Sequence, residues 1–178
     1  AGIRVVGPHA LGVVNTDPQV RLNASLASAV PEPGPVGLFC QSAAVGDALL
    51  RRCSERGIGI SGFVGAGNRG DVAGNDMLQF WREDPRTSVV LLHLETMGDA
   101  RKFARVVQAT AGAMPVAMVR GGGAEAFLPS GHSVGGTLLT RRAVSDLLDD
   151  SGVLLVDTTD ALLDVAVVVA DRDLPGAA

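Results

Sequence analysis

The chain has 178 residues, of which 47% are apolar and 19% charged, and its net charge is −4. This length is typical of one domain, and the apolar fraction is sufficient for a buried core. The acidic balance excludes a general nucleic-acid binder, because affinity for phosphate backbones comes from clustered Lys and Arg. The longest apolar run, residues 161–170, contains Asp164 and is too short to cross a bilayer. Since the chain does not begin with a signal-peptide pattern, we expect a cytoplasmic protein without nucleic-acid or membrane partners.

The first segment, residues 1–34, predicts a linker. One short apolar run is followed by Asn, Asp, Pro and Ser without helical or strand periodicity, and Pro31, Pro33 and Gly34 close the segment. This composition is typical of a connection between two folded units. We therefore expect a linker from a preceding domain at 1–34, a folded domain at 35–172, and the start of a second linker at 173–178.

From residue 36 onward, short apolar runs alternate with amphipathic stretches, a pattern typical of repeated βαβ units around a parallel sheet. Strands are predicted at 36–40, 58–64, 88–94, 115–119 and 153–156. Helices are predicted at 43–56, 76–83, 99–111, 138–150 and 159–170. The nearly continuous apolar runs among the strands favour burial on both faces. The pattern predicts an α/β fold, with a flavodoxin-like doubly wound parallel sheet of about five strands and helices on both faces.

In this architecture ligands bind beyond the carboxyl ends of the strands. The first strand passes through Gln41 and Ser42 directly into a helix. Ser42 suits the N-cap, and the N–H groups of Ala43, Ala44 and Val45 would point past the sheet. A helix start with small side chains favours a bound phosphate. The alternative is a simple capped turn without a ligand.

Glu95 and His132 are the other candidates at strand ends. Glu95 follows a buried strand, where a carboxylate needs a partner, although a solvated rim residue is the alternative. His132 lies in "LPSGHSVGG" among Gly131, Gly135 and Gly136, which permit tight turns. If Glu95 accepts the Nδ1 proton, Nε2 of His132 keeps a lone pair for attack on phosphorus. The alternative for His132 is an ordinary surface histidine.

The remaining residues with reactive or aromatic side chains are predicted to have structural roles. His93 is predicted to lie in the core, and Cys40 and Cys53 are predicted to be buried thiols. Phe80 and Trp81, on a short helix, are predicted to pack against the sheet or against a neighbouring domain. Two cysteines at this spacing indicate neither a disulfide framework nor a zinc site, so no metal site is expected.

Four motifs occur in a fixed order: "CQSAAVG" at 40–46, "GNRGDVAGNDML" at 67–78, "HLE" at 93–95 and "GHSVGG" at 131–136. In this order and spacing the chain resembles the flavodoxin-like domain of NDP-forming acyl-CoA synthetases, relatives of the succinyl-CoA synthetase alpha subunit. The corresponding motifs there are "SQSGALG", "GNKAD", "YLE" and "SHTGA" or "GHAGA". The opening segment resembles the end of that family's CoA-binding domain and its linker. The resemblance covers nearly the whole chain.

The resemblance implies a role for each candidate. His132 would be phosphorylated transiently and would relay phosphate between an acyl phosphate and a nucleotide. Glu95 would orient His132, the helix start at Ser42, Ala43, Ala44 and Val45 would bind the phosphate, and Gly131, Gly135 and Gly136 would form the hinge of the loop. The implied overall reaction converts acyl-CoA, NDP and phosphate into a carboxylic acid, CoA and NTP, in either direction.

The resemblance also implies cofactors and partners. The domain alone would bind no cofactor, whereas its parent protein would use CoA, ADP or ATP, and Mg. Its partners would be the CoA-binding and ATP-grasp domains of the parent, with phosphate or acyl phosphate as ligand, and an isolated copy could form a homodimer.

Two alternative functions stay open. The linker resembles that of bacterial proteins in which a synthetase-like region is fused to a GNAT-type lysine acetyltransferase, where this domain would be a non-catalytic ligand sensor. Ala43 and Val134 stand where the synthetases have Gly. Side chains at these two positions favour the ligand sensor over the phosphate relay. FMN binding is the second alternative, but five Phe, one Trp and no Tyr provide few rings to stack on a flavin.

Overall fold

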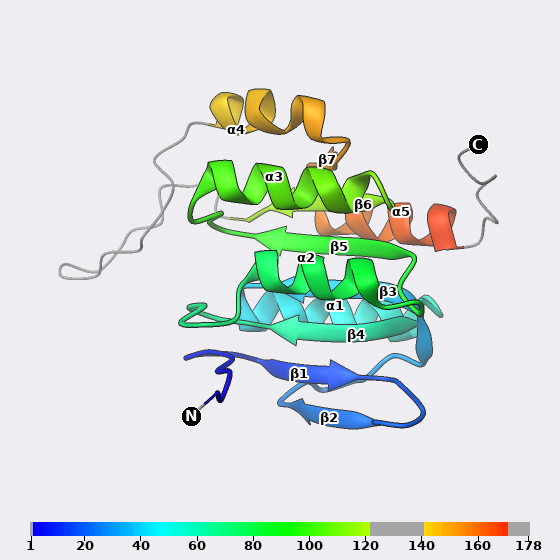
Figure 1. Cartoon of the computed structure of the whole chain (residues 1–178). Coiled ribbons are helices and arrows are strands. Elements are labelled where there is room, and N and C mark those ends of the chain that lie inside the picture. The colour runs from blue at the N-terminus through cyan, green and yellow to red at the C-terminus, as the bar shows by residue number, and fades with distance from the viewer. Residues whose placement is uncertain (1, 122–140, 171–178) are drawn as a thin grey trace.

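The computed structural model describes residues 2–121 and 141–170. Within these ranges, seven strands form one sheet in the order β2-β1-β4-β3-β5-β6-β7 (Figure 1). The strands are β1 (Gly12–Asn15), β2 (Leu22–Ser25), β3 (Pro33–Cys40), β4 (Ile60–Gly65), β5 (Val89–Leu94), β6 (Val116–Arg120) and β7 (Leu154–Val156). The helices are α1 (Ala43–Glu55), α2 (Gly74–Glu83), α3 (Ala100–Ala111), α4 (Arg141–Leu148), the 3₁₀ turn η1 (Asp149–Ser151) and α5 (Thr159–Ala170).

The five strands from β3 to β7 run parallel and confirm the flavodoxin-like prediction. The first of them, β3, pairs with the second, β4, on one side and with the third, β5, on the other. Strands β6 and β7 then follow β5 in sequence order. This 2-1-3-4-5 arrangement is that of flavodoxin. Every predicted strand and helix from residue 36 onward overlaps an observed one.

The amino-terminal segment differs from its prediction, because it contains two strands. Strand β1 pairs antiparallel with both β4 and β2, so the sheet has seven strands where about five were expected. Each of the two strands has four residues, and Val14 is the one fully buried side chain in them. So short a strand with a single buried residue shows no period-two alternation, which is why the sequence pattern missed it. That this segment also follows another domain stays a prediction.

Helices cover both faces of the parallel strands (Figure 1). One core layer lies between the sheet and helices α1 and α5, and includes Leu38, Leu50 and Leu163. The other lies between the sheet and helices α2 and α3, and includes Phe39 and Phe103. Because successive strand residues point to opposite faces, Leu38 and Phe39 belong to different layers. This two-sided burial explains the nearly continuous apolar strands.

Trp81 packs against the backbone of β3, which agrees with the predicted packing against the sheet. Its side chain is buried, and a Cβ placed on Gly37 would lie 2.6 Å from Trp81 Cδ2. Gly37 therefore leaves the space that the indole ring occupies. Neighbouring Phe80 is half-exposed. Across the residues that the structure describes, no helix has the length and apolar character needed to span a membrane.

Candidate functional site

The candidate site lies at the carboxyl ends of β3 and β5, where the strand order reverses. Cys40, the last residue of β3, pairs with His93 in β5, so the segments that follow the two strands leave the sheet side by side. Doubly wound proteins bind their ligands at such a switch point. The structure thus places two of the predicted site residues, Ser42 and Glu95, on adjacent strand ends.

Gln41 joins these two strand ends. Its side chain is buried, and Oε1 accepts hydrogen bonds from the N–H of Glu95 at 2.6 Å and of Thr96 at 2.9 Å. Nε2 donates to the carbonyl oxygen of Thr96 at 2.8 Å. Three hydrogen bonds from one amide fix the position of the Glu95 backbone relative to the start of α1. The sequence interpretation assigned Gln41 no role. The sequence did contain a signal for this role, namely a polar amide directly after a strand that was predicted to be buried. A buried amide requires hydrogen-bond partners.

Helix α1 begins with the predicted cap. Ser42 is the N-cap, and its Oγ accepts a hydrogen bond from the N–H of Val45 at 3.4 Å. The first backbone hydrogen bond of the helix runs from Gly46 N–H to the Ser42 carbonyl. Among the described residues, the N–H groups of Ala43 and Ala44 have no acceptor. The helix start therefore offers two free donors toward the strand ends, one fewer than the sequence predicted.

Glu95 lies beside Gly121, the residue that follows β6. Gly121 N–H donates to the carbonyl oxygen of Leu94 at 2.9 Å, which continues the pairing of the two strands. A Cβ on Gly121 would lie 3.3 Å from Glu95 Cγ. Glu95 is exposed and is therefore available to a ligand or another side chain. The other predicted site residues, His132, Gly131, Gly135 and Gly136, lie outside the described residues.

His93 in β5 and Cys40 in β3 are paired residues close to Glu95. Both are buried, as predicted. His93 Nδ1 is 3.5 Å from Cys40 Sγ. Burial lowers the pKa of His93, and the Glu95 carboxylate opposes this shift. Burial raises the pKa of the Cys40 thiol to about 12. The thiol is thus protonated and unreactive at neutral pH.

Arg69 brings a positive charge to the same strand ends. It follows β4, has a left-handed backbone with φ of 54°, and donates from Nη1 to the Thr96 carbonyl at 2.9 Å and from Nη2 to Thr96 Oγ1. Burial lowers the pKa of Arg69, against the opposing influence of Glu95. Thr96 O thus accepts hydrogen bonds from both Gln41 and Arg69. The sequence motif around Arg69 was recognised, but this contact with Thr96 was not predicted.

The amino-terminal segment fixes the loop that carries Arg69. Asn68 N–H donates to Pro8 O at 2.9 Å, and Gly70 N–H donates to Gly7 O at 2.8 Å. Next in the loop, Asp71 accepts hydrogen bonds from the Arg4 side chain. The segment that was predicted as a linker is therefore part of the support of the site.

Comparison with known proteins identifies the family. Residues 33–169 match the family described as the succinyl-CoA ligase like flavodoxin domain. The chain belongs to this family. The match includes β3 to β7 and the whole candidate site, and leaves out β1 and β2.

Relatives of this succinyl-CoA ligase like flavodoxin domain are CoA ligases. The chain is 32% identical over 176 residues to an ADP-forming 4-hydroxybutyrate–CoA ligase of Nitrosopumilus maritimus (strain SCM1), covering 97% of this chain and 25% of the ligase. It is 31% identical over 175 residues to the alpha subunit of ADP-forming acetate–CoA ligase I of Pyrococcus furiosus (strain ATCC 43587 / DSM 3638 / JCM 8422 / Vc1), covering 98% of this chain and 37% of the subunit.

A solved structure with the same fold is the dinucleotide-forming acetyl-coenzyme A synthetase 1 of Ca. Korarchaeum cryptofilum in complex with phosphate and ADP. It is 28% identical with a TM-score of 0.85, and the match covers 99% of this chain and 38% of the synthetase chain. The chain thus spans between a quarter and two-fifths of the length of these relatives.

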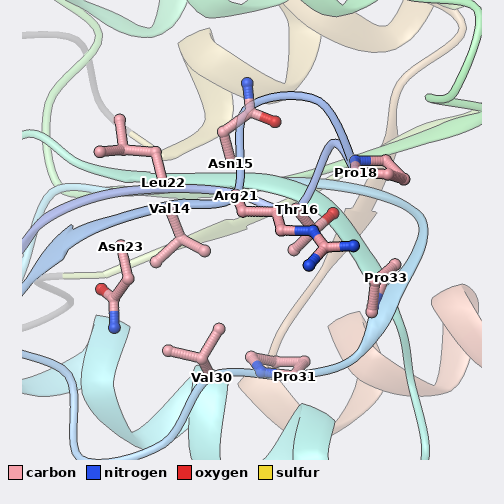
Figure 2. Close-up of a pocket in the computed structure, with 10 residues that line it drawn as sticks. All are labelled: Val14, Asn15, Thr16, Pro18, Arg21, Leu22, Asn23, Val30, Pro31 and Pro33. Atoms are coloured by element: carbon pink, nitrogen blue, oxygen red, sulfur yellow. The ribbon is translucent and has the colours of Figure 1, made fainter.

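Two pockets of similar volume lie away from the switch point. One pocket of about 330 Å³ lies between β1, β2 and the amino end of β3, where Figure 2 shows the Arg21 side chain among Thr16, Pro18 and Pro33. A second pocket of about 330 Å³ lies between β1, β4 and helix α2, beside Phe80. Within the described ranges, no three His, Cys, Asp or Glu side chains form a group able to bind a metal ion. Neither pocket includes a predicted site residue.

Proposed function

We propose that this chain is the phosphohistidine-carrying domain of an NDP-forming acyl-CoA synthetase. The observation that supports the proposal best is the position of Glu95 beside the start of α1, at the switch point of a succinyl-CoA ligase like flavodoxin domain. Relatives that match nearly the whole chain are ADP-forming CoA ligases.

The proposed reaction has two steps at His132. Nε2 attacks the phosphorus of an acyl phosphate, so that an N–P bond forms, the bond from phosphorus to the acyl oxygen breaks, and the carboxylate leaves. An oxygen of the terminal phosphate of NDP then attacks the same phosphorus, the N–P bond breaks, and NTP forms. In both steps the Glu95 carboxylate accepts a hydrogen bond from Nδ1–H of His132, which stabilises the cationic phosphorylated imidazole.

The residues at the strand ends suit a phosphoryl group. The N–H groups of Ala43 and Ala44 and the positive end of the α1 dipole favour a bound anion. The CoA and acyl sites would belong to a CoA-binding domain, and the nucleotide with its Mg ion to an ATP-grasp domain. No step at His132 is assigned to the metal ion.

The test uses the polypeptide that contains this chain together with its ATP-grasp partner. ATP radiolabelled at the γ-phosphate should transfer label to the protein whatever acid the enzyme uses. The label should be acid-labile and base-stable, should vanish in His132→Ala, and should fall at least roughly a hundredfold in rate in Glu95→Gln. Gln79→Ala, a change of an exposed residue of α2 away from the site, is the control and should keep the label. Absence of label on a folded protein that still binds ATP would contradict the phosphate relay.

A second candidate is the ligand-sensing module of a GNAT-type acetyltransferase. Ala43 favours it, because its methyl group lies at the helix start where the synthetases have Gly and narrows access to the backbone donors. In this case acetyl-CoA or phosphate would bind without any label on His132, and binding would change the acetyltransferase rate.

A further inference from the structure

The pocket beside Phe80 lies over a part of the sheet that α2 leaves open. Helix α2 packs against β3 and β5, whereas the pocket lies over β1 and β4. Most of its lining residues are apolar, and they include Val13, Val64, Val72 and Met77. A volume of about 330 Å³ and apolar walls are typical of sites for small molecules.

Trp81 directs its one polar side-chain atom toward this pocket. The indole ring lies over Gly37 of β3 and Gly62 of β4, which are paired in the sheet. A Cβ on Gly37 would lie 2.6 Å to 2.9 Å from carbon atoms of the ring, whereas a Cβ on Gly62 would lie 3.7 Å from Nε1. The Nε1 edge therefore points away from β3, toward β4 and the pocket that Gly62 and Trp81 both line.

The indole N–H is a hydrogen-bond donor without a partner. Only 1% of Trp81 is exposed. Among the residues that the structure describes, no oxygen accepts a hydrogen bond from Nε1, and the hydroxyl of Ser61, another lining residue, is bonded to Thr87 Oγ1 at 2.7 Å. The N–H of a buried Trp usually has an acceptor. A ligand with a carbonyl oxygen would supply the acceptor that this N–H lacks.

The charges at the pocket disfavour an anionic ligand. Arg4 and Asp76 both line the pocket, and Arg4 Nη2 donates to Asp76 Oδ1 at 3.0 Å. Arg4 Nε also donates to both carboxylate oxygens of Asp71 at 3.0 Å. One guanidinium is thus shared by two carboxylates, which leaves one negative charge in excess. A neutral ligand avoids the repulsion that a carboxylate would meet there.

We infer that this pocket binds a small neutral aromatic compound, whose ring packs against Val13 and Phe80 and whose carbonyl oxygen accepts the Nε1–H of Trp81. The apolar walls favour the ring, the unpaired N–H favours a carbonyl oxygen, and the excess negative charge excludes a carboxylate. This site is separate from the switch point, so the inference does not depend on the proposed function.

Nuclear magnetic resonance of the isotope-labelled chain tests the hydrogen bond, with para-fluoroacetanilide, a neutral aromatic amide, as the probe. The chain has a single Trp, so its indole N–H gives one resonance. The probe should move this resonance downfield in a saturable way, with a Kd of roughly 1 mM for a compound of this size. An indole resonance that is unchanged at about 10 mM probe would overturn the inference.

A carboxylate of similar size, para-fluorophenylacetate, tests the charge argument. It should bind at least roughly fivefold more weakly than the amide, because it adds a second uncompensated negative charge beside Asp76. Equal or tighter binding of the carboxylate would contradict the neutral class of ligand.

Variants locate the probe, and the line width of its fluorine resonance measures binding. Val13→Phe should abolish binding, because the larger side chain fills the space over β1. Val20→Phe, the same change at a position that is 54% exposed and does not line the pocket, is the matched control and should bind as the wild type does. Phe80→Ala, which removes a half-exposed ring, should weaken binding roughly threefold or more. Wild-type binding in both Val13→Phe and Phe80→Ala would overturn the location.

The polypeptide that contains this chain decides between a ligand and a neighbouring domain as the occupant of the pocket. Binding of para-fluoroacetanilide to that polypeptide, and its loss in Val13→Phe, would support a ligand site. Binding to the chain alone but not to the longer polypeptide would show that another domain covers the pocket, and would overturn the inference.

Discussion

At the scale of single residues, the candidate site depends on polar side chains that connect strand ends. Gln41 and Arg69 follow different strands, and both donate to the carbonyl oxygen of Thr96. Glu95, between a buried strand and Thr96, is therefore anchored by its backbone while its side chain stays exposed. A site residue that is fixed in this way needs little reorganisation when a ligand binds.

Gln41→Leu should destabilise the fold by about 2–4 kcal/mol. The substitution keeps a similar side-chain volume but removes three hydrogen bonds, which leaves the N–H groups of Glu95 and Thr96 without their acceptor. Urea unfolding, followed by the fluorescence of the single Trp81, measures the loss. Gln79→Leu, the same change at an exposed position of α2, should alter the free energy of unfolding by less than about 0.5 kcal/mol. Equal stability of the two variants would contradict the role of Gln41.

At the scale of elements, the amino-terminal strands are part of the folded unit. Leu11, just before β1, is buried against β4 and α1, where a Cβ on Gly65 or Gly46 would touch it at 2.7 Å or 3.2 Å. Its carbonyl oxygen accepts the N–H of Leu26. The sheet therefore continues past β4 into a segment that lies outside the matched family region.

Leu11→Ala should lower the free energy of unfolding by about 2–5 kcal/mol, because it removes buried methyl groups from the edge of the core. The measurement is again urea unfolding. Leu26→Ala is the matched control, since the Leu26 side chain is 85% exposed and its truncation removes little buried surface. If residues 1–34 were only a linker, the two variants would be equally stable.

At the scale of the whole molecule, the buried thiols connect stability to alkaline pH. Burial raises the pKa of Cys40 to about 12 and of Cys53 to about 11, from an ordinary value of 9.0. The folded state thus keeps two protons that the unfolded state releases above this ordinary value. Deprotonation therefore stabilises the unfolded chain, and stability is lost as the pH rises.

The free energy of unfolding should decrease by roughly 1 kcal/mol per thiol for each pH unit between about 9 and 11, and should not depend on the thiols at neutral pH. The chain has no tyrosine and a single lysine, Lys102, so few other groups titrate in this range. Urea unfolding at a series of pH values measures the slope. The double variant Cys40→Ala, Cys53→Ala should lose most of it, and an unchanged slope would contradict the assignment.

The sequence alone determined the α/β class, the positions of the five parallel strands, and Ser42 and Glu95 as strand-end candidates. These features are local, because each depends on periodicity or capping within a few neighbouring residues. The family motifs, which are also continuous in sequence, led to the same family as the comparisons.

The tertiary structure decided which strands are neighbours, the addition of β1 to β4, and the contacts of Gln41, Arg69 and His93. Gln41 and Thr96 are 55 positions apart, and Cys40 and His93 are 53 positions apart. No local pattern relates residues at such separations, since their meeting depends on the order in which the strands pack. The same chain order is compatible with several strand orders, so only the folded sheet shows that Glu95, His93 and Gly121 converge.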